Sequence, residues 1–260
     1  MSKSIFKPIT QWLSQATMRK VPEVIILFWI IKLLTTAMGE STSDYLVHTV
    51  DPIIAVIIGF IGFVVAIVLQ FWVRMYVAWT YWLAVTMVAI FGTMAADVLH
   101  IGLGIPYVIS TIFFAVALTI IFTLWYKTEK TLSIHSIYTT RRELFYWATV
   151  VTTFALGTAA GDMSAVTLQF GYLSSGILFG ALFALPLIAY KLFGMSEVFM
   201  FWFAYIMTRP FGASFADLFG RTKVLGGLGF GTEKTSIVLT ILIIILVSYL
   251  SVTKKDIKSN

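Results

Sequence analysis

The chain has no cysteine, few charged residues and neither of two common hydrolase motifs. Without cysteine, disulfides, thiolate nucleophiles, iron–sulfur clusters and cysteine-bound zinc are excluded. Only 12% of the residues are charged, about half the share in a soluble domain, whereas 59% are hydrophobic. Neither HExxH nor GxSxG occurs, so the sequence predicts no enzyme and no cofactor. This composition is typical of a protein that folds in a lipid bilayer.

Long apolar stretches indicate eight membrane-spanning helices. A spanning helix needs about 20 largely apolar residues. Such stretches, bounded by charges, prolines or turn residues, cover 22–43, 52–73, 75–97, 106–126, 143–163, 171–190, 196–216 and 235–253. The sequence therefore predicts an all-α, polytopic membrane protein with one membrane domain over 21–253 and a cytoplasmic tail at 254–260. Residues 127–142 are rich in Thr, Ser, Lys and Arg, and we expect them to form a solvated loop between two four-helix halves.

Basic residues gather on one side of these spans. Thirteen lie in the termini and in the loops on their side, and the opposite loops hold only Arg221, Lys223 and Lys234. The positive-inside rule then predicts that both termini are cytoplasmic, in a bacterial inner membrane. The formal net charge of +6 is thus explained by topology, and no nucleic-acid partner is expected.

Residues 1–20 form a separate basic segment. Apolar residues recur in it at helical spacing, at Ile5, Phe6, Ile9, Trp12 and Leu13. This spacing favours an amphipathic helix over 4–16 that lies on the inner membrane surface. A disordered tail is the alternative.

One pattern recurs in four of the eight spans. Each copy is Trp, nine residues, Gly, four residues and Asp. The copies are Trp29, Gly39 and Asp44; Trp82, Gly92 and Asp97; Trp147, Gly157 and Asp162; and Trp202, Gly212 and Asp217. The pattern uses four of the eight tryptophans and four of the six aspartates, which coincidence between unrelated helices does not explain.

Each repeat holds two helices, so the sequence predicts four parallel helical hairpins that enter the membrane in the same orientation. Their approximate bounds are 21–73, 75–126, 141–191 and 196–253. Around a pseudo-fourfold or nested pseudo-twofold axis, the equivalent ends of the four first helices would approach one another, and the four aspartates would converge. Small residues flank the repeat glycines, which permits close backbone approach or a local helix break.

The segments TTAMGESTSDYL, FGTMAADVLH, ALGTAAGDM and RPFGASFADLFG, with their preceding tryptophans, resemble a family of bacterial membrane proteins. Members of that family consist of four tandem two-helix repeats of unknown function. The resemblance covers about residues 21–253. It implies the four-hairpin architecture but no activity, so function has to be inferred from individual residues.

Acidic residues and histidines of the first two repeats are the candidate cation ligands. Glu40, Asp44 and His48 follow at i, i+4 and i+8, and Asp97 and His100 are spaced i, i+3. Carboxylate and imidazole groups suit a divalent cation such as manganese, or a proton relay. We expect Glu40, Asp44 and Asp97 to be the metal ligands, with His48 and His100 as further candidates. If the helix ends before His48, that histidine is instead a solvated loop residue.

Charges in the other spans complete the candidate pathway. Asp162 and Asp217 are the equivalent aspartates of the last two repeats, and Arg221 follows Asp217 by one helical turn. We therefore expect Asp217 to be neutralised internally and to contribute less than Asp44 or Asp97. Lys32 and Arg209 lie deep in spans, where they either replace the cation as counter-charges or simply form stabilising pairs.

Two classes of function fit these patterns. The leading hypothesis is a transporter that exchanges a small cation, such as a divalent metal, for protons through a cavity lined by the repeat aspartates. The alternative is a non-transporting membrane scaffold or partner-binding subunit whose aspartates are paired. The expected partners are the lipid bilayer and the small cation or proton; the sequence does not define an oligomeric state. The glycine-rich loop 226–231 lacks the context of a phosphate-binding loop and is expected to be a turn or lid.

Overall fold

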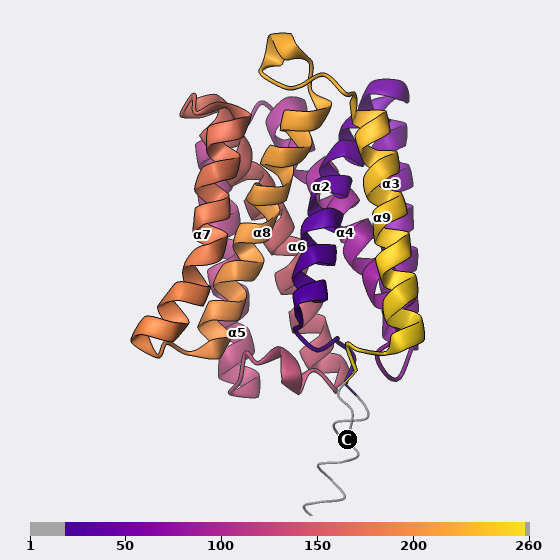
Figure 1. Cartoon of the computed structure of the whole chain (residues 1–260), viewed down its shortest axis with the longest axis vertical. Helices are drawn as coiled ribbons and strands as arrows, with labels where there is room; N and C mark the ends of the chain where they lie inside the picture. Colours follow the sequence, from indigo (N-terminus) through magenta and orange to yellow (C-terminus); the bar gives the residue numbers. More distant parts are fainter. Residues whose placement is uncertain (1–18, 258–260) are drawn as a thin grey trace, which may run out of the picture.

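The described part of the chain is a bundle of eight long helices (Figure 1). The structure is a computed structural model and describes residues 19–257. Its α-helices are α2 (Ile26–Thr49), α3 (Pro52–Trp72), α4 (Ala78–Asp97), α5 (Tyr107–Glu129), α6 (Thr140–Asp162), α7 (Gly171–Phe193), α8 (Glu197–Gly220) and α9 (Thr232–Thr253). The amphipathic helix expected over 4–16 lies outside the described residues.

All eight predicted spans are helices, and the all-α prediction is confirmed. The largest difference is at α2, which continues to Thr49 and not to about residue 43, so His48 is helical. The helix ends where the next one begins, because the Asp51 carboxylate accepts hydrogen bonds from the backbone N–H groups of Ile53 and Ile54 and Pro52 occupies the first helical position.

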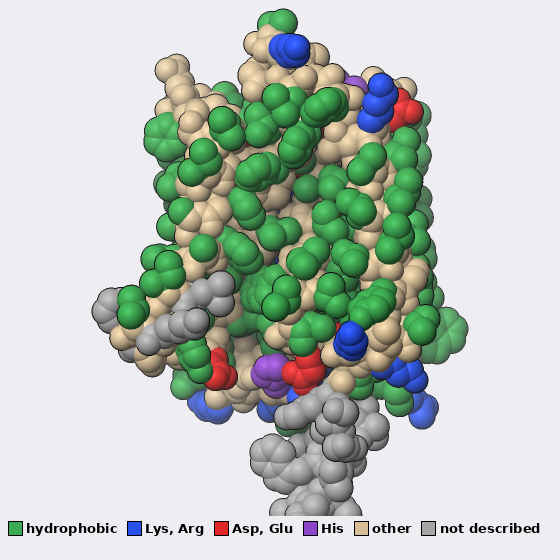
Figure 2. All heavy atoms as spheres, viewed as in Figure 1, with side chains coloured by type: hydrophobic (Ala, Val, Ile, Leu, Met, Phe, Trp, Pro, Cys, Tyr) green, Lys and Arg blue, Asp and Glu red, His purple; other side chains and the backbone are tan. Residues whose placement is uncertain are grey.

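The outer surface of the bundle is apolar, which makes this an integral membrane protein in contact with the lipid bilayer. Six helices, α3, α4, α5, α6, α7 and α9, are long and apolar enough to cross a membrane. Large hydrophobic side chains project outwards from the outer helices, as Figure 2 shows for one face, and Ile53 and Phe113 are 72% and 61% exposed. In lipid such exposure costs nothing, whereas in water it would favour aggregation.

The two remaining helices, α2 and α8, are more polar because they carry Lys32, Glu40, Asp44, Arg209 and Asp217. Both run through the middle of the bundle among the six apolar helices (Figure 1). Their polar side chains are therefore shielded from lipid by protein. The bundle thus buries charge and exposes hydrocarbon, as a membrane protein must.

Four inner helices form a ring, and four outer helices surround it. α2 contacts α4 and α8, and α6 contacts the same two helices. The outer helix of each repeat packs against the inner helix of the next repeat: α3 against α4, α5 against α6, α7 against α8, and α9 back against α2. The chain therefore closes into a ring of four hairpins, as the pseudo-fourfold arrangement predicts.

The repeat glycines are the contact points of this ring. A Cβ atom added to Gly39, Gly92, Gly157 or Gly212 would meet Ala89, Phe154, Arg209 or Thr36, respectively, in the next repeat. Each of these partners stands seven residues after the tryptophan of its own repeat. The same contact thus recurs four times around the ring, and glycine is required because the helices approach too closely for a side chain.

The end of the bundle that holds residues 19–25 and 254–257, called here the near end, is tied together by polar contacts. Lys20 is buried, and its Nζ lies 2.5 Å from Glu143 Oε2, while Gln70 donates to the other oxygen of Glu143. The hydroxyl of Tyr76 donates to Asp256, and burial raises the pKa of that carboxyl. Part of the predicted tail is therefore packed against the bundle.

The connection between the halves is not the fully solvated loop that its composition predicts. α5 continues to Glu129, and a 3₁₀ turn spans Ile134–Ser136. Ile134 and Ile137 are buried in the core, with exposed fractions of 5% and 0%. Two isoleucines among polar residues are enough to fix the segment against the bundle.

The glycine contacts generate a stability prediction. We expect Gly39→Ala to destabilise the protein by about 1–3 kcal/mol, because the new methyl would lie 2.8 Å from the Ala89 carbonyl carbon and must push α2 from α4. Thermal unfolding of the purified protein in detergent measures the effect. The control is Gly102→Ala, where the nearest atom would be 3.7 Å away and no loss is expected. Equal unfolding temperatures for the two variants would contradict the contact.

Candidate functional site

One guanidinium group on the axis of the bundle joins all four repeats. Nη2 of Arg209, in α8, lies within hydrogen-bonding distance of three acceptors, Glu40 Oε2 at 2.5 Å, Thr158 Oγ1 at 2.7 Å and Thr93 Oγ1, which share its two N–H groups. Arg209 is only 1% exposed. The three acceptors come from α2, α4 and α6, and each directly follows its repeat glycine. Because the fourth repeat has Ala213 at that position, the ring of acceptors is open where Arg209 enters.

A second arginine bridges two repeat aspartates closer to the end of the bundle that lies opposite the near end. Nη2 of Arg221 lies 2.9 Å from Asp44 Oδ2, and its Nε donates to Asp217 Oδ1 at 3.0 Å. The predicted pairing of Asp217 with Arg221 is therefore present. Because Asp44 shares the same partner, the reason for ranking Asp217 below Asp44 no longer holds.

The glycine-rich loop holds this arginine in place. The backbone N–H of Gly229 donates to the Arg221 carbonyl at 2.9 Å, and that of Phe230 donates to the Phe219 carbonyl at 3.0 Å. A Cβ on Gly227 would lie 2.6 Å from the Arg221 carbonyl carbon, so only glycine fits. The loop is thus a turn folded back on the end of α8, one of the two expected forms.

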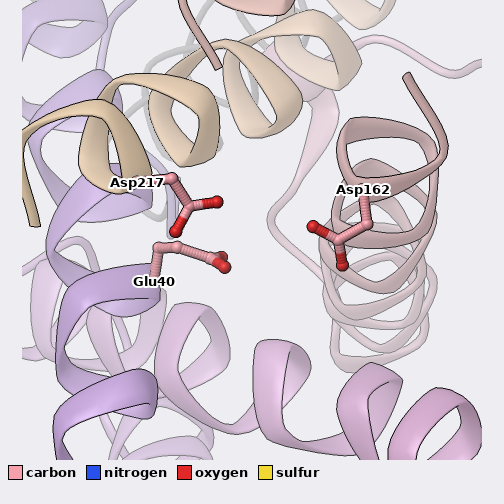
Figure 3. Close-up of side chains that lie close together, drawn as sticks. All are labelled: Glu40, Asp162 and Asp217. Carbon is pink, nitrogen blue, oxygen red and sulfur yellow. The ribbon is translucent and has the colours of Figure 1, made fainter. Parts of the chain in front are cut away.

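Three carboxylates from different repeats, including the Arg221 partner Asp217, converge in the interior of the bundle. Oxygens of Glu40, Asp162 and Asp217 lie within 4.8 Å of one another. Figure 3 shows these side chains pointing toward a common space from α2, α6 and α8. The sequence predicts a different set, Glu40 with Asp44 and Asp97. Only Glu40 belongs to both sets, because Asp44 turns to Arg221 instead.

Asp97 and Asp162 form a second structural class among the repeat aspartates. Each is the last residue of its α-helix and is followed by one turn of π-helix, Val98–Gly102 or Met163–Thr167. Both carboxylates are half-buried, and among residues 19–257 neither has a salt-bridge partner. Tyr107 and Tyr172 are close enough to interact with Asp162 electrostatically. These two aspartates are therefore the unneutralised carboxylates of the site.

Lys32 pairs with aromatic rings and with no acid. Its Nζ lies 3.8 Å from the ring centre of Phe154 and 4.1 Å from that of Tyr205. Within the described residues Nζ has no hydrogen-bond acceptor. Cation–π attraction replaces part of the lost hydration of the ammonium. Of the two counter-charges predicted for the pathway, Arg209 contacts a carboxylate and Lys32 does not.

The two histidines do not join the carboxylates. His48 is exposed, and its Nδ1 lies 2.6 Å from the backbone oxygen of Asp44. His100 is buried, within hydrogen-bonding distance of the Ile105 carbonyl at 3.2 Å and of the Ser110 hydroxyl. Each histidine is thus bound to groups near its own helix end. The structure leaves an all-oxygen ligand set.

Three of the four repeat tryptophans pack in the interior. Trp82, Trp147 and Trp202 are 1%, 3% and 4% exposed. Nε1 of Trp202 donates to the Leu132 carbonyl at 2.9 Å, which fixes the connection between α5 and α6. Trp29 is only half-buried. The packing role predicted for the repeat tryptophans therefore fits Trp82, Trp147 and Trp202 better than Trp29.

Sequence reasoning missed the two threonines that bind Arg209. Thr93 and Thr158 occupy the same repeat position as Glu40, directly after the glycine, and this alignment was the available signal. It also missed the buried contact of Lys20 with Glu143 and Gln70, for which the repeat pattern offers no signal. In the sequence, Lys20 counts only as one of the thirteen basic residues on the predicted cytoplasmic side.

The electrostatic balance of the site is negative. Five acidic side chains, Glu40, Asp44, Asp97, Asp162 and Asp217, lie in one electrostatically interacting cluster with Arg209 and Arg221, and Lys32 lies beside Arg209. The cluster thus has two more acidic than basic groups.

Carboxylate oxygens are the preferred ligands of hard divalent cations, whose bonds of about 2.0–2.6 Å put opposite ligands about 4–5 Å apart. The triad of Glu40, Asp162 and Asp217 matches that spacing.

These features define an integral membrane protein built of four helical-hairpin repeats around a buried polar axis. The family model described as Repeat of Unknown Function (DUF347) matches four times, over residues 27–76, 80–131, 145–195 and 200–256. The chain belongs to this family. No curated protein and no solved structure matches the chain.

The role of Arg209 can be tested by stability measurements. We expect Arg209→Leu to cost about 3–5 kcal/mol of unfolding free energy, because it leaves the Glu40 carboxylate buried without a partner. The double variant Arg209→Leu with Glu40→Leu should regain most of this loss. Arg141→Leu is the control, since Arg141 is 68% exposed in its pair with Glu129 and should cost less than about 1 kcal/mol. If the single and double variants are equally unstable, the pair is not the cause.

Proposed function

We propose that this protein transports a small cation across the membrane, with a divalent metal such as manganese as the cargo and protons as the exchanged ion. The observation that carries the proposal is the convergence of Glu40, Asp162 and Asp217 from three repeats to within 4.8 Å. Three carboxylates so close in a membrane interior repel one another unless a cation or protons are shared among them.

The basic groups supply a means of exchange. Arg209 and Arg221 form salt bridges with Glu40, Asp44 and Asp217 while no cargo is bound. An arriving cation binds first at the half-buried Asp162, which has no salt-bridge partner among the described residues. It then competes with the guanidinium groups for Glu40 and Asp217. The excess of two acidic groups matches one divalent cation or two protons.

The direction of insertion follows from the basic residues. The near end holds Arg74, Lys127, Lys130, Arg141, Arg142, Lys254 and Lys255 together with Arg19 and Lys20. We propose that this end faces the cytoplasm of a bacterial inner membrane, with both termini inside. The carboxylates then lie toward the external side.

A scaffold function is the second candidate, and the salt bridges favour it. Glu40, Asp44 and Asp217 all have arginine partners, as a purely structural role requires. Asp97 and Asp162 have none among the described residues, and this difference supports transport over the scaffold. Ion flux separates the two candidates.

The transport test uses purified protein in liposomes with an internal metal indicator and an internal pH dye. We expect manganese entry to be accompanied by proton exit, and we expect Asp162→Asn, and equally Asp217→Asn, to abolish both fluxes. Neutralisation removes the charge that binds the metal and the group that binds the proton.

The matched control is Glu233→Gln, which removes an exposed carboxylate at the start of α9 and should leave flux unchanged. Each variant must reach normal abundance and elute as a single species. Full activity of well-folded Asp162→Asn would refute the carboxylate pathway. Absence of flux in the unaltered protein, for every metal tried, would favour the scaffold.

Topology is tested by fusing a reporter that is active only in the cytoplasm. Fusions after residue 260 and within the connection at residue 131 should be active, and a fusion in the loop at residue 224 should be inactive, because the basic residues hold the near end inside. Activity at residue 224 alone would reverse the proposed orientation.

A further inference from the structure

A cavity of about 620 Å³ opens on one side of the bundle, away from the carboxylates. Its walls are α2, α7, α8 and residues 132–135, and they are mainly apolar. Figure 2 looks onto this face, where the surface is hollowed between α8 and α2. Cavities of this volume hold drug-sized molecules.

The cavity exists because equivalent positions of two repeats carry different side chains, one of which packs into the bundle while the other does not. At the corresponding place in the preceding repeat, Trp125 of α5 is fully buried and its ring centre lies 5.7 Å from that of Trp202. Tyr190 of α7 holds the equivalent position, 43 residues after its repeat tryptophan as Trp125 is, but it is 48% exposed. Trp29, the counterpart of Trp202, is therefore left lining an open space.

Aromatic rings form one wall of this space. The ring centre of Trp29 lies 5.6 Å from those of both Phe183 and Phe201. The π faces of three converging rings attract a cation, and the rings also pack against apolar groups. Such a wall suits a molecule that is both hydrophobic and positively charged.

A carboxylate completes the lining. Glu197 lies at the cavity and accepts a hydrogen bond from the Tyr190 hydroxyl at 3.1 Å. Among the basic side chains that the structure describes, none forms a salt bridge with it. His135 also lines the cavity, and its Nδ1 lies 3.6 Å from Glu23 Oε2. The mouth therefore carries an acidic group available to a ligand.

We propose that this cavity binds an amphiphilic organic cation, whose apolar body packs against Trp29, Phe183 and Phe201 and whose positive group faces Glu197. The site does not depend on the proposed cation transport, because it shares none of the carboxylates of that pathway. Its ligand reaches it from the bilayer, since apolar side chains at its edge, such as Ile26 and Ile30, are 79% and 42% exposed.

The test compares two probes of nearly the same size and shape but opposite charge, tetraphenylphosphonium and tetraphenylborate. Binding to the purified full-length protein is measured by calorimetry, with detergent micelles alone as the blank. We expect the phosphonium to bind at least about tenfold more tightly than the borate. Glu197→Gln should lose most of this preference by weakening the phosphonium alone, and Trp29→Leu should weaken both probes.

Glu233→Gln is the matched control and should bind both probes as the unaltered protein does. Each variant must unfold at the same temperature as the unaltered protein and elute as a single species. Equal affinity of the two probes for the unaltered protein would overturn the proposal, and so would equal effects of Glu197→Gln and Glu233→Gln.

The natural source of the cation is resolved by competition. Displacement of the phosphonium by phosphatidylethanolamine but not by phosphatidylglycerol assigns the site to the amine headgroup of a membrane lipid. Displacement by neither lipid assigns it to a free lipophilic cation. Phosphonium binding that persists in Asp162→Asn, whatever its flux, separates this site from the transport pathway.

Discussion

The structure depends on one buried interaction, between the guanidinium of Arg209 and its acceptors in the three other repeats, on the axis of the bundle. Taking a guanidinium out of water costs several kcal/mol unless acceptors surround it, and here the acceptors come from the three other repeats. These bonds fix how α2, α4, α6 and α8 are rotated relative to one another. Yet Nε and Nη1 of Arg209 have no partner among the described residues. The group is therefore held through Nη2 only, and in the proposed transport this would allow it to shift when a cation replaces it at Glu40.

The four repeats share one backbone arrangement, but their aspartates have two different kinds of surroundings. In the first and fourth repeats the inner helix continues past its aspartate, and Arg221 forms a salt bridge with both carboxylates. In the second and third repeats a π-helical turn follows the aspartate, and no described basic group pairs with Asp97 or Asp162. π-Helical turns are often found at functional sites. The similar repeats thus form two kinds of aspartate in the same polar cluster, two that share the Arg221 guanidinium and two without a described salt-bridge partner.

Much of this fold follows from the sequence, because apolar length and repeat spacing are local properties. The spans, the four hairpins and the gathering of Asp44, Asp97, Asp162 and Asp217 at one end all follow from them. The partners of individual side chains do not. Helical spacing fixes the face on which Glu40 lies but not what it meets across the axis, so its pairing with Arg209 and its approach to Asp162 needed the structure. The cavity beside Trp29 could not be predicted from the sequence either. It forms because Tyr190 is exposed, whereas Trp125, at the equivalent repeat position, is buried.

For the proposed transport, charge balance in a medium of low dielectric constant favours coupled exchange of ions over uncoupled leakage. Five carboxylates against three basic groups leave the cluster with an excess of two negative charges when every group is ionised. Moving an uncompensated charge of that size through the hydrocarbon region is very costly. The cluster can change the side it faces at low cost only when its charge is compensated, by one divalent cation or by two protons. In the proposed transport, one of these ions would therefore move inwards as the other moves outwards, because the empty and fully ionised cluster is the state of highest energy.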